Sequence, residues 1–167
     1  MLTKLIDVSN DYKEQCKIVT MMRDDEGIRE VFSNRIDRLA NSRYSFIVKK
    51  GTKDIGFVNL VIEKQDPTFY FLDIGLKEYY RNMGIGTHIL NTLQQMEFDK
   101  FIILEVKADN KLANASVGRN GVVVMMKDGI IYYLLQKDRV REFIDGDYLE
   151  KLGNHVAIKS KKDLLKK

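Results

Sequence analysis

Hydrophobic positions along the chain follow two spacings, one typical of strands and one typical of helices. Residues 68–76 are almost continuously apolar and aromatic, as in a central strand covered on both faces, and the polar exception is Asp73. A helical period follows, with an apolar residue at every third or fourth position between residues 85 and 96. The pattern therefore predicts a strand, a loop and an amphipathic helix over about residues 84–97.

The rest of the chain has the same two kinds of pattern. Further strands are predicted at 2–8, 43–50, 55–64, 101–106, 122–126 and 130–136, and further helices from 12 to about 22, from 24 to about 39, from 110 to about 120, and beyond 137 with an interruption at Gly146. Short polar links between the strands at 43–50, 55–64 and 68–76 predict an antiparallel meander. The helix before 101–106 predicts that this strand runs parallel to 68–76.

Two glycines stand where the strand at 68–76 gives way to the next helix. Gly84 and Gly86 lack a Cβ, so a ligand can approach the first N–H groups of the helix, and these groups favour an anion. Arg81 adds a positive charge. The pattern predicts a phosphate-binding turn, although it is neither a Walker loop nor a complete dinucleotide fingerprint. The structural alternative is that both glycines only permit tight packing between helix and strand.

The loop Arg81-Asn82-Met83-Gly84-Ile85-Gly86 resembles the Arg/Gln-x-x-Gly-x-Gly/Ala loop of the GNAT acetyltransferase superfamily. Its flanks are similar too, at residues 72–76 and at 104–110, with Gly121 eleven residues after Asn110. The resemblance extends over about residues 46–136. It implies a single α/β (α+β) domain over residues 1–136, with a mixed, mostly antiparallel sheet of six to seven strands and helices on both faces. Residues 137–167 would be a helical extension that covers a face of the domain or makes a homodimer contact.

The resemblance also implies a cosubstrate, acetyl-CoA, and residues that bind it. Backbone amides of the loop would hold its pyrophosphate, and the edge of the preceding strand would pair with the amides of its pantetheine arm, which enters where two strands splay apart. Asn110 matches the family residue that contacts this arm. The expected binding residues are Ile74, Gly75, Leu76, Arg81, Asn82, Met83, Gly84, Ile85, Gly86, Thr87 and Asn110.

Acetyl transfer to an amine needs a base, because the amine arrives as an ammonium ion. Glu105 is the first candidate, since it matches a glutamate base in acetyltransferases that resemble those modifying the N-termini of ribosomal proteins. A carboxylate that is only structural, or that orients the substrate, is an equally good interpretation of Glu105. Asp73 is the second candidate and Glu63 the third.

At the position of the residue that would protonate the leaving thiolate, this sequence differs from the family pattern. Many members carry a tyrosine seven residues after the asparagine, and here that position is Val117. Valine has no proton to give. The tyrosines at positions 79, 80, 132 and 133 replace it only if folding brings one of them close.

Composition indicates the class of protein and the cellular compartment to expect. The chain has 167 residues, 44% hydrophobic and 31% charged, as in globular proteins, and no apolar run approaches the roughly 20 residues that span a membrane. The N-terminus lacks the features of a signal peptide, and the single cysteine, Cys16, fits a reducing compartment. We therefore expect a cytoplasmic protein. Cys16 falls on the apolar stripe of the first helix, which predicts an inert core thiol. Neither His88 nor His155 has a partner at a metal-ligand spacing, so no metal site is predicted.

The formal charge of +4 equals that of the last nine residues, 159–167, which hold five lysines and one aspartate. Such a tail can touch nucleic acid, although a solvated terminus explains it better. The leading hypothesis is an acetyl-CoA-dependent N-acetyltransferase acting on a primary amine of a small molecule or peptide. The alternatives are a non-catalytic acyl-CoA-binding module and, less favoured, a nucleic-acid-binding protein.

Overall fold

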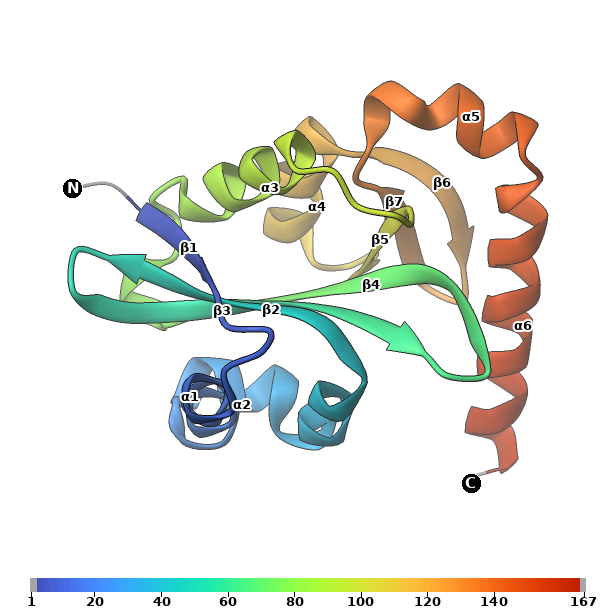
Figure 1. Ribbon diagram of the computed structural model, residues 1–167. Coiled ribbons are helices and arrows are strands. Elements are labelled where there is room, and N and C mark those ends of the chain that lie inside the picture. The colour runs from blue at the N-terminus through green and yellow to red at the C-terminus, as the bar shows by residue number, and fades with distance from the viewer. Residues whose placement is uncertain (1–2, 166–167) are drawn as a thin grey trace.

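Seven strands form one open sheet, and helices pack on both of its faces (Figure 1). The computed structural model describes residues 3–165, except the side chains of residues 33–35 and 160–165. The strands lie in the order β1-β2-β3-β4-β5-β7-β6. Their bounds are β1 Thr3–Asp7, β2 Ser42–Lys50, β3 Lys53–Glu63, β4 Asp66–Leu76, β5 Ile102–Lys107, β6 Val122–Lys127 and β7 Ile130–Leu134. The α-helices are α1 Tyr12–Asp24, α2 Glu26–Phe32, α3 Ile85–Gln95, α4 Lys111–Asn120, α5 Val140–Asp145 and α6 Tyr148–Leu165, and the 3-10 helices are η1 Ser33–Asn41, η2 Glu78–Tyr80 and η3 Lys137–Arg139.

The topology confirms the predicted fold class. Strands β1 to β4 form an antiparallel meander, and β4 runs parallel to β5 across the connection that contains α3. Strands β6 and β7 form an antiparallel hairpin that joins the sheet through β7 and β5. The sheet is therefore mixed and mostly antiparallel.

Alternate residues of the central strands face two different helical layers, because successive side chains of a strand point to opposite faces. On one face, Tyr70 and Leu72 of β4 pack in the cluster that includes Ile89 and Leu93 of α3. The opposite face is covered in two parts. Helices α1, α2 and η1 cover the side of β2 and β3, whereas α5 and α6 cover the side of β5 and β7 (Figure 1).

The C-terminal segment beyond residue 136 packs against the second face of the sheet. Phe143 of α5 is fully buried against Phe69 and Phe101, with ring centroids 5.9 and 5.2 Å apart. Leu152 and Val156 of α6 belong to the same cluster. This segment therefore covers part of the core, which was one of the two roles expected for it.

The predicted helix from residue 24 to about 39 is correct only in its first part. Helix α2 ends at Phe32, and a 3-10 helix, η1, continues to Asn41. The hydrophobic spacing continued beyond Phe32, but spacing alone does not distinguish an α-helix from the tighter 3-10 turns.

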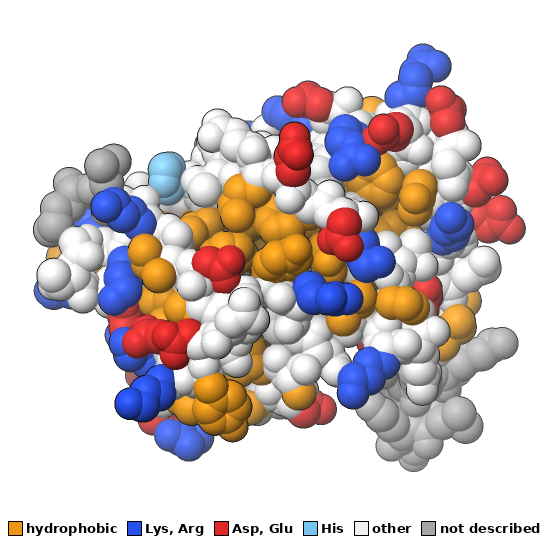
Figure 2. All heavy atoms as spheres, in the orientation of Figure 1, with side chains coloured by type: hydrophobic (Ala, Val, Ile, Leu, Met, Phe, Trp, Pro, Cys, Tyr) orange, Lys and Arg blue, Asp and Glu red, His pale blue; other side chains and the backbone are white. Residues whose placement is uncertain are grey.

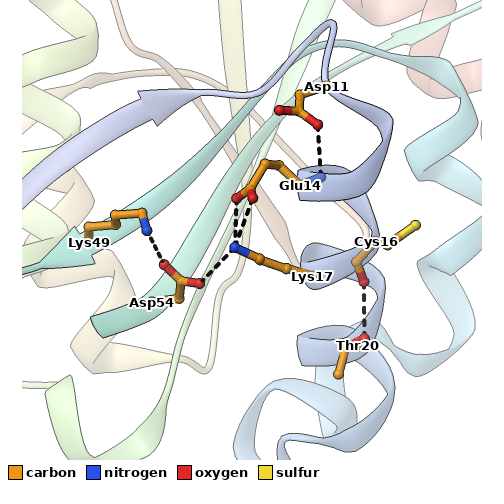
Figure 3. Close-up of polar contacts among 7 residues, drawn as sticks. All are labelled: Asp11, Glu14, Cys16, Lys17, Thr20, Lys49 and Asp54. Carbon is orange, nitrogen blue, oxygen red and sulfur yellow. Dashed lines mark hydrogen bonds and ion pairs between the residues drawn. The ribbon is translucent and has the colours of Figure 1, made fainter. Parts of the chain in front are cut away.

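The prediction that Cys16 is a core thiol was wrong, because Cys16 is exposed. The buried stripe of α1 consists instead of Ile18, Met21 and Met22. Lys17 lies 2.8 Å from Glu14 and 3.8 Å from Asp54 of the β2–β3 hairpin, and Lys49 also pairs with Asp54. Figure 3 shows these charged groups on the side of α1 that faces the hairpin, and the cysteine sulfur pointing away from them. The rotation of α1 that buries Ile18, Met21 and Met22 thus turns Cys16 toward solvent.

On the face seen in Figure 2, the described lysine and arginine side chains are interspersed with aspartates and glutamates. The basic tail predicted at 159–167 lies, after Lys159, outside the residues whose side chains are described. None of the helices between residues 3 and 165 is long and apolar enough to cross a bilayer.

Candidate functional site

Strands β4 and β5 pair in the sheet at only two positions. Tyr70 pairs with Ile102 and Phe71 with Ile103, and no pair beyond these joins the two strands among the described residues. The rest of β5 pairs on its other side with β7, and β4 pairs with β3 as far as Leu76. From residue 72 of β4 and residue 104 of β5 onward, the two facing edges therefore have no strand partner. An extended peptide-like molecule can pair with an edge of this kind.

The loop between β4 and α3 leaves its N–H groups available. Within residues 3–165, no backbone hydrogen bond is donated by any N–H from Asn82 to Thr87, and the first N–H that is satisfied by the helix belongs to His88. Asn82 and Gly84 have positive φ values of 61° and 79°. Gly84 is the N-cap of α3, so these donors lie at the positive end of the helix dipole.

Tight packing does not explain the two loop glycines. A Cβ added at Gly84 or at Gly86 would meet no atom within 4 Å, so the fold itself leaves this space open. The alternative interpretation, that both glycines only allow helix and strand to approach, was therefore wrong. Close approach occurs instead in the sheet, where a Cβ at Gly75 would lie 2.4 Å from the Phe57 ring and one at Gly56 would lie 2.2 Å from the Gly75 carbonyl oxygen.

Arg81 lies beside the end of β4. Its Nε donates a hydrogen bond to the carbonyl oxygen of Leu76 at 3.0 Å. Its guanidinium group also lies against Gly27 of α2, where an added Cβ would be 2.9 Å from one of its nitrogens. Arg81 is exposed, fixes the end of the strand and turns its guanidinium group toward α2.

Two carboxylates lie on the two sides of the β4–β5 separation. Asp73 and Glu105 each stand two residues beyond the last pair, Phe71 and Ile103, so both side chains point to the face that carries α1, α2 and α6. Asp73 is buried, with 4% of its surface exposed, and Glu105 is half-buried. The structure thus brings together the first and second candidates for the base.

The third candidate, Glu63, is not in this place. Glu63 pairs with Asp66 at the turn between β3 and β4, seven positions along β4 from Asp73, which corresponds to roughly 23 Å of extended strand. It is therefore excluded from the group around the β4–β5 separation.

Each of the two carboxylates faces a cation from a flanking helix. Lys159 of α6 lies 2.9 and 3.2 Å from the two oxygens of Glu105, and Arg38 of η1 lies 3.6 Å from Asp73. Sequence reasoning identified neither cation. One signal was present for Lys159, since it follows Leu152 and Val156 at helical spacing and so continues the stripe that faces the sheet.

A row of polar side chains continues from Asp73 into the core. Asn59 of β3 pairs in register with Asp73, and Ser45 of β2 pairs with Asn59. The Asn59 side chain is fully buried, and among the described residues its amide has no hydrogen-bond partner. A buried amide without a partner costs free energy, so Asn59, beside Asp73, is a polar position in the core that the described residues leave unsatisfied.

Asn110 caps helix α4 on the opposite face of the sheet. Its Oδ1 accepts a hydrogen bond from the Ala113 N–H at 3.1 Å, as is usual for an N-cap asparagine. Asn114, which sequence reasoning did not single out, donates to the carbonyl oxygens of Lys107 and Asn110 at 2.9 Å and accepts a 2.7 Å hydrogen bond from Tyr133. Asn114 therefore orders the loop from β5 to α4.

The position of the missing family tyrosine is apolar and packed. Val117 is buried in the cluster of α3, α4 and the sheet. The Tyr133 hydroxyl donates its proton to Asn114, and Tyr79 is exposed. Tyr132 stands opposite Glu105 in the β5–β7 pairing, where burial, and secondarily the negative charge of Glu105, raises the pKa of its phenol to about 12.

The two histidines make separate contacts. His155 of α6 lies 3.1 Å from an oxygen of Asp66 and stacks on Phe71, and His88 of α3 contacts the carbonyl oxygen of Thr3 at 3.2 Å. In the part of the chain that the structure describes, no three His, Cys, Asp or Glu side chains gather as they would around a metal ion.

The comparisons with known proteins agree with this fold. Residues 5–121 match the model of the acetyltransferase (GNAT) family. No curated protein sequence matches the chain. The solved structures to which it is similar include the Campylobacter jejuni N-acetyltransferase PseH in complex with acetyl coenzyme A, at a TM-score of 0.54 and 16% identity, with 80% of this chain and 98% of that chain covered.

Two further structures have the same fold. One is a chimera of the spermidine N-acetyltransferase SpeG from Vibrio cholerae and hSSAT, at a TM-score of 0.58 and 14% identity, with 84% of this chain and 99% of that chain covered. The other is the microcin C7 self-immunity acetyltransferase MccE in complex with acetyl-CoA and AMP, at a TM-score of 0.51 and 17% identity, with 72% of this chain and 86% of that chain covered. At such identities the likeness extends to the fold alone.

Proposed function

The chain belongs to the GNAT acetyltransferase family, and we propose on that premise that it is an N-acetyltransferase, which transfers the acetyl group of acetyl-CoA to a primary amine of a small molecule or peptide. One observation carries the proposal. The unsatisfied N–H groups of residues 82–87 follow the edge of β4 that has lost its strand partner, after the single 3-10 turn of η2. An anionic group and an extended amide-containing arm, which CoA joins in one molecule, would find their partners side by side.

The binding residues follow from this arrangement. The N–H groups of Asn82 to Thr87 would hold the pyrophosphate, and the open space over Gly84 and Gly86 would let it reach the backbone. The β4 edge at residues 74–76 would pair with the pantetheine amides. Asn110, whose Oδ1 already caps α4, would offer its amide N–H groups to the same arm. PseH and MccE, which have the same fold, were crystallised with acetyl-CoA, and this supports the choice of cosubstrate.

Glu105 would act as the base. Bound acetyl-CoA supplies a thioester, whose carbonyl carbon the amine nitrogen attacks while the bond from carbon to sulfur breaks. The Glu105 carboxylate would accept a proton from the ammonium group of the acceptor, because it stands at the strand separation on the face away from α3. Asp73, across the separation, would favour and orient the same cation by its negative charge.

The leaving group needs no strong acid in this scheme. A thiol has a pKa near 8.5, so its thiolate leaves readily, and a phenol with a pKa of about 12 such as Tyr132 is a much weaker acid than the thiol. Full proton transfer from Tyr132 would be uphill by roughly three units of pKa, or about 4–5 kcal/mol. We therefore propose that no side chain protonates the sulfur, which leaves as the thiolate and takes up a proton from solvent after it has left.

Acetyl-CoA binding and amine turnover test the proposal separately. Titration calorimetry with acetyl-CoA should show one site per chain, and a panel of small primary amines and N-terminal peptides should show acceptor-dependent release of free CoA. A protein that does not bind acetyl-CoA would contradict the proposal as a whole.

One observation favours a second candidate, a non-catalytic acyl-CoA-binding module. The buried Val117 occupies the position at which many family members have a tyrosine. Tight binding of acetyl-CoA without turnover of any amine in the panel would support this module and contradict the enzyme.

A further inference from the structure

Helix α6 is fixed against the sheet by contacts on both sides of its apolar stripe. Leu152 and Val156 are buried against the second face of the sheet, together with Phe71 and Ile103. Between them, His155 bonds to Asp66 at 3.1 Å and stacks on Phe71 with ring centroids 4.6 Å apart. These contacts determine which residue of the next helical turn faces the sheet.

That residue is Lys159. It follows Val156 by three positions and His155 by four, so it continues the same face of α6. Glu105 likewise follows Ile103 by two positions on the same face of β5. The two therefore meet one step beyond the packed core, and the Lys159 Nζ lies 2.9 and 3.2 Å from the two carboxylate oxygens. The Lys159 side chain remains 44% exposed, whereas that of Glu105 is 18% exposed.

This contact has the geometry expected of an acceptor. A primary ammonium group donates hydrogen bonds to the carboxylate proposed as the base, at the point where β4 and β5 part. Surface ion pairs are weak, and a side chain that is nearly half exposed moves readily from one partner to another. An amine that arrives from solution would have to take the place of Lys159 on Glu105.

We infer that Lys159 is a site of self-acetylation, at which the chain uses its own ε-amine as an acceptor for acetyl-CoA. The inference rests on the proposed function. Glu105 takes a proton from the ammonium group, the freed nitrogen of Lys159 bonds to the acetyl carbon, and the carbon–sulfur bond breaks. The products are N-acetyl-Lys159, CoA and one proton released to solvent. The acetylated nitrogen carries no charge, so the ion pair with Glu105 is lost. The Glu105 carboxylate is then free to bind an amine from solution.

Mass spectrometry of the full chain after incubation with acetyl-CoA tests the inference. We expect one added acetyl group, mapped by peptide sequencing to Lys159, with a rate per chain that is independent of protein concentration because transfer is intramolecular. Lys159→Arg should lose this modification. Lys151→Arg is the matched control, since Lys151 lies on the same helix but its Nζ contacts the Tyr148 ring at 4.4 Å. In this variant, Lys159 should be acetylated at the wild-type rate.

Non-enzymatic acetylation has a different signature. It would modify exposed lysines such as Lys151 as fast as Lys159, and Glu105→Gln would leave it unchanged. We expect Glu105→Gln to slow acetylation of Lys159 by at least about tenfold. Equal rates in the two proteins would overturn the inference.

The outcomes separate this inference from the proposed function. A chain that acetylates an added amine but never Lys159 would overturn the inference and leave the function standing. A chain that acetylates neither would overturn both. Lys159→Ala should still acetylate added amines, and a loss of that activity would assign Lys159 to the reaction itself and so contradict its role as an acceptor.

Discussion

Asp73 and Glu105 stand at the same level of the sheet on two strands that have just separated. Each follows the last β4–β5 pair, Phe71 and Ile103, by two residues, and both point to the face opposite α3. Arg38 and Lys159 face them from the two helical walls on that face. Both carboxylates already form ion pairs with cationic side chains of the same protein. The same negative charges would attract an acceptor amine that arrives as an ammonium ion.

Substitution of Gly86 separates binding from folding. A Cβ at this position meets nothing within 4 Å in the free protein, so Gly86→Ala should keep the fold and raise its free energy of unfolding by a few tenths to about 1 kcal/mol, as alanine favours helix. The same methyl group would occupy the space needed by the pyrophosphate. We expect the Kd for acetyl-CoA to rise about tenfold. Calorimetry measures this Kd, and thermal unfolding of the same variant measures its stability.

Gly118 of α4 provides the control for this experiment. An added Cβ there also meets no atom within 4 Å. Gly118→Ala should therefore stabilise the chain to a similar extent and leave the affinity for acetyl-CoA unchanged. Equal affinities of the Gly86 variant and the wild type would contradict the assignment of the loop.

Replacement of Glu105 by Gln should slow turnover by about 10²- to 10⁴-fold at neutral pH, because no side chain then removes the proton from the ammonium group. The deficit should shrink as pH rises toward the pKa of the amine, near 10.4 for a lysine-like acceptor, since a growing fraction arrives neutral. A pH series of kcat/KM checks this. Glu150→Gln, on the exposed side of α6, serves as the control. A pH profile that keeps its wild-type shape would remove Glu105 as the base.

Replacement of Tyr132 by Phe should change kcat by less than about fivefold. Burial and Glu105 together raise the pKa of this phenol to about 12, so it is a poor donor to a thiolate. The shape of the variant's pH–rate profile should match that of the wild type. A loss of about 10²-fold or more would instead identify Tyr132 as the acid and contradict departure of the sulfur as an unprotonated thiolate.

Asp73→Asn should destabilise the chain. Asp73 is buried and lies 3.6 Å from Arg38, which is partly buried, so the neutral amide leaves the guanidinium without its counter-charge. We expect the free energy of unfolding to fall by about 1–3 kcal/mol in urea titrations. The control is Asp24→Asn, whose partner Arg23 is exposed, and which should leave the midpoint unchanged. Equal stabilities of the Asp73 variant and the wild type would mean that the charge of Asp73 is dispensable for the fold.

The contact between Tyr70 and Asp99 predicts a dependence of stability on pH. The Tyr70 hydroxyl donates to an oxygen of Asp99 at 2.5 Å, and this hydrogen bond lowers the pKa of Asp99, while burial, and then Asp99, raises the pKa of Tyr70. A lowered carboxyl pKa stabilises the fold above about pH 4, and this contribution is lost as pH falls through the folded-state value.

Tyr70→Phe should therefore cost about 1 kcal/mol at pH 7. A raised phenol pKa adds stability that persists up to about pH 10 and is lost above it, so the difference between variant and wild type should be flat from about pH 5 to 9. Urea titrations across this range, and on the acid side to below about pH 4, measure it. A difference that does not shrink at acid pH would show that Asp99 contributes nothing through its charge.

The sequence by itself determined the elements and their order. The apolar run of β4, the period of α3 and the polar turns between β2, β3 and β4 are local signals, and each corresponds to an observed element within a few residues. The parallel β4–β5 pair followed from these signals, because short connections leave few topologies open. The fold class and the family followed from the resemblance of the loop at residues 81–86 and its flanks.

Tertiary structure alone decided which side chains meet. Cys16 was assigned to the core from its spacing, but α1 buries Ile18, Met21 and Met22 instead, and Cys16 lies on the opposite side of the helix. Glu63 and Asp73 lie on neighbouring strands, yet the antiparallel register separates them. Lys159 meets Glu105, 54 residues away in the chain, only because α6 packs across the sheet. Contacts of this kind depend on the packing angle and register of whole elements, and no local pattern of hydrophobic residues encodes them.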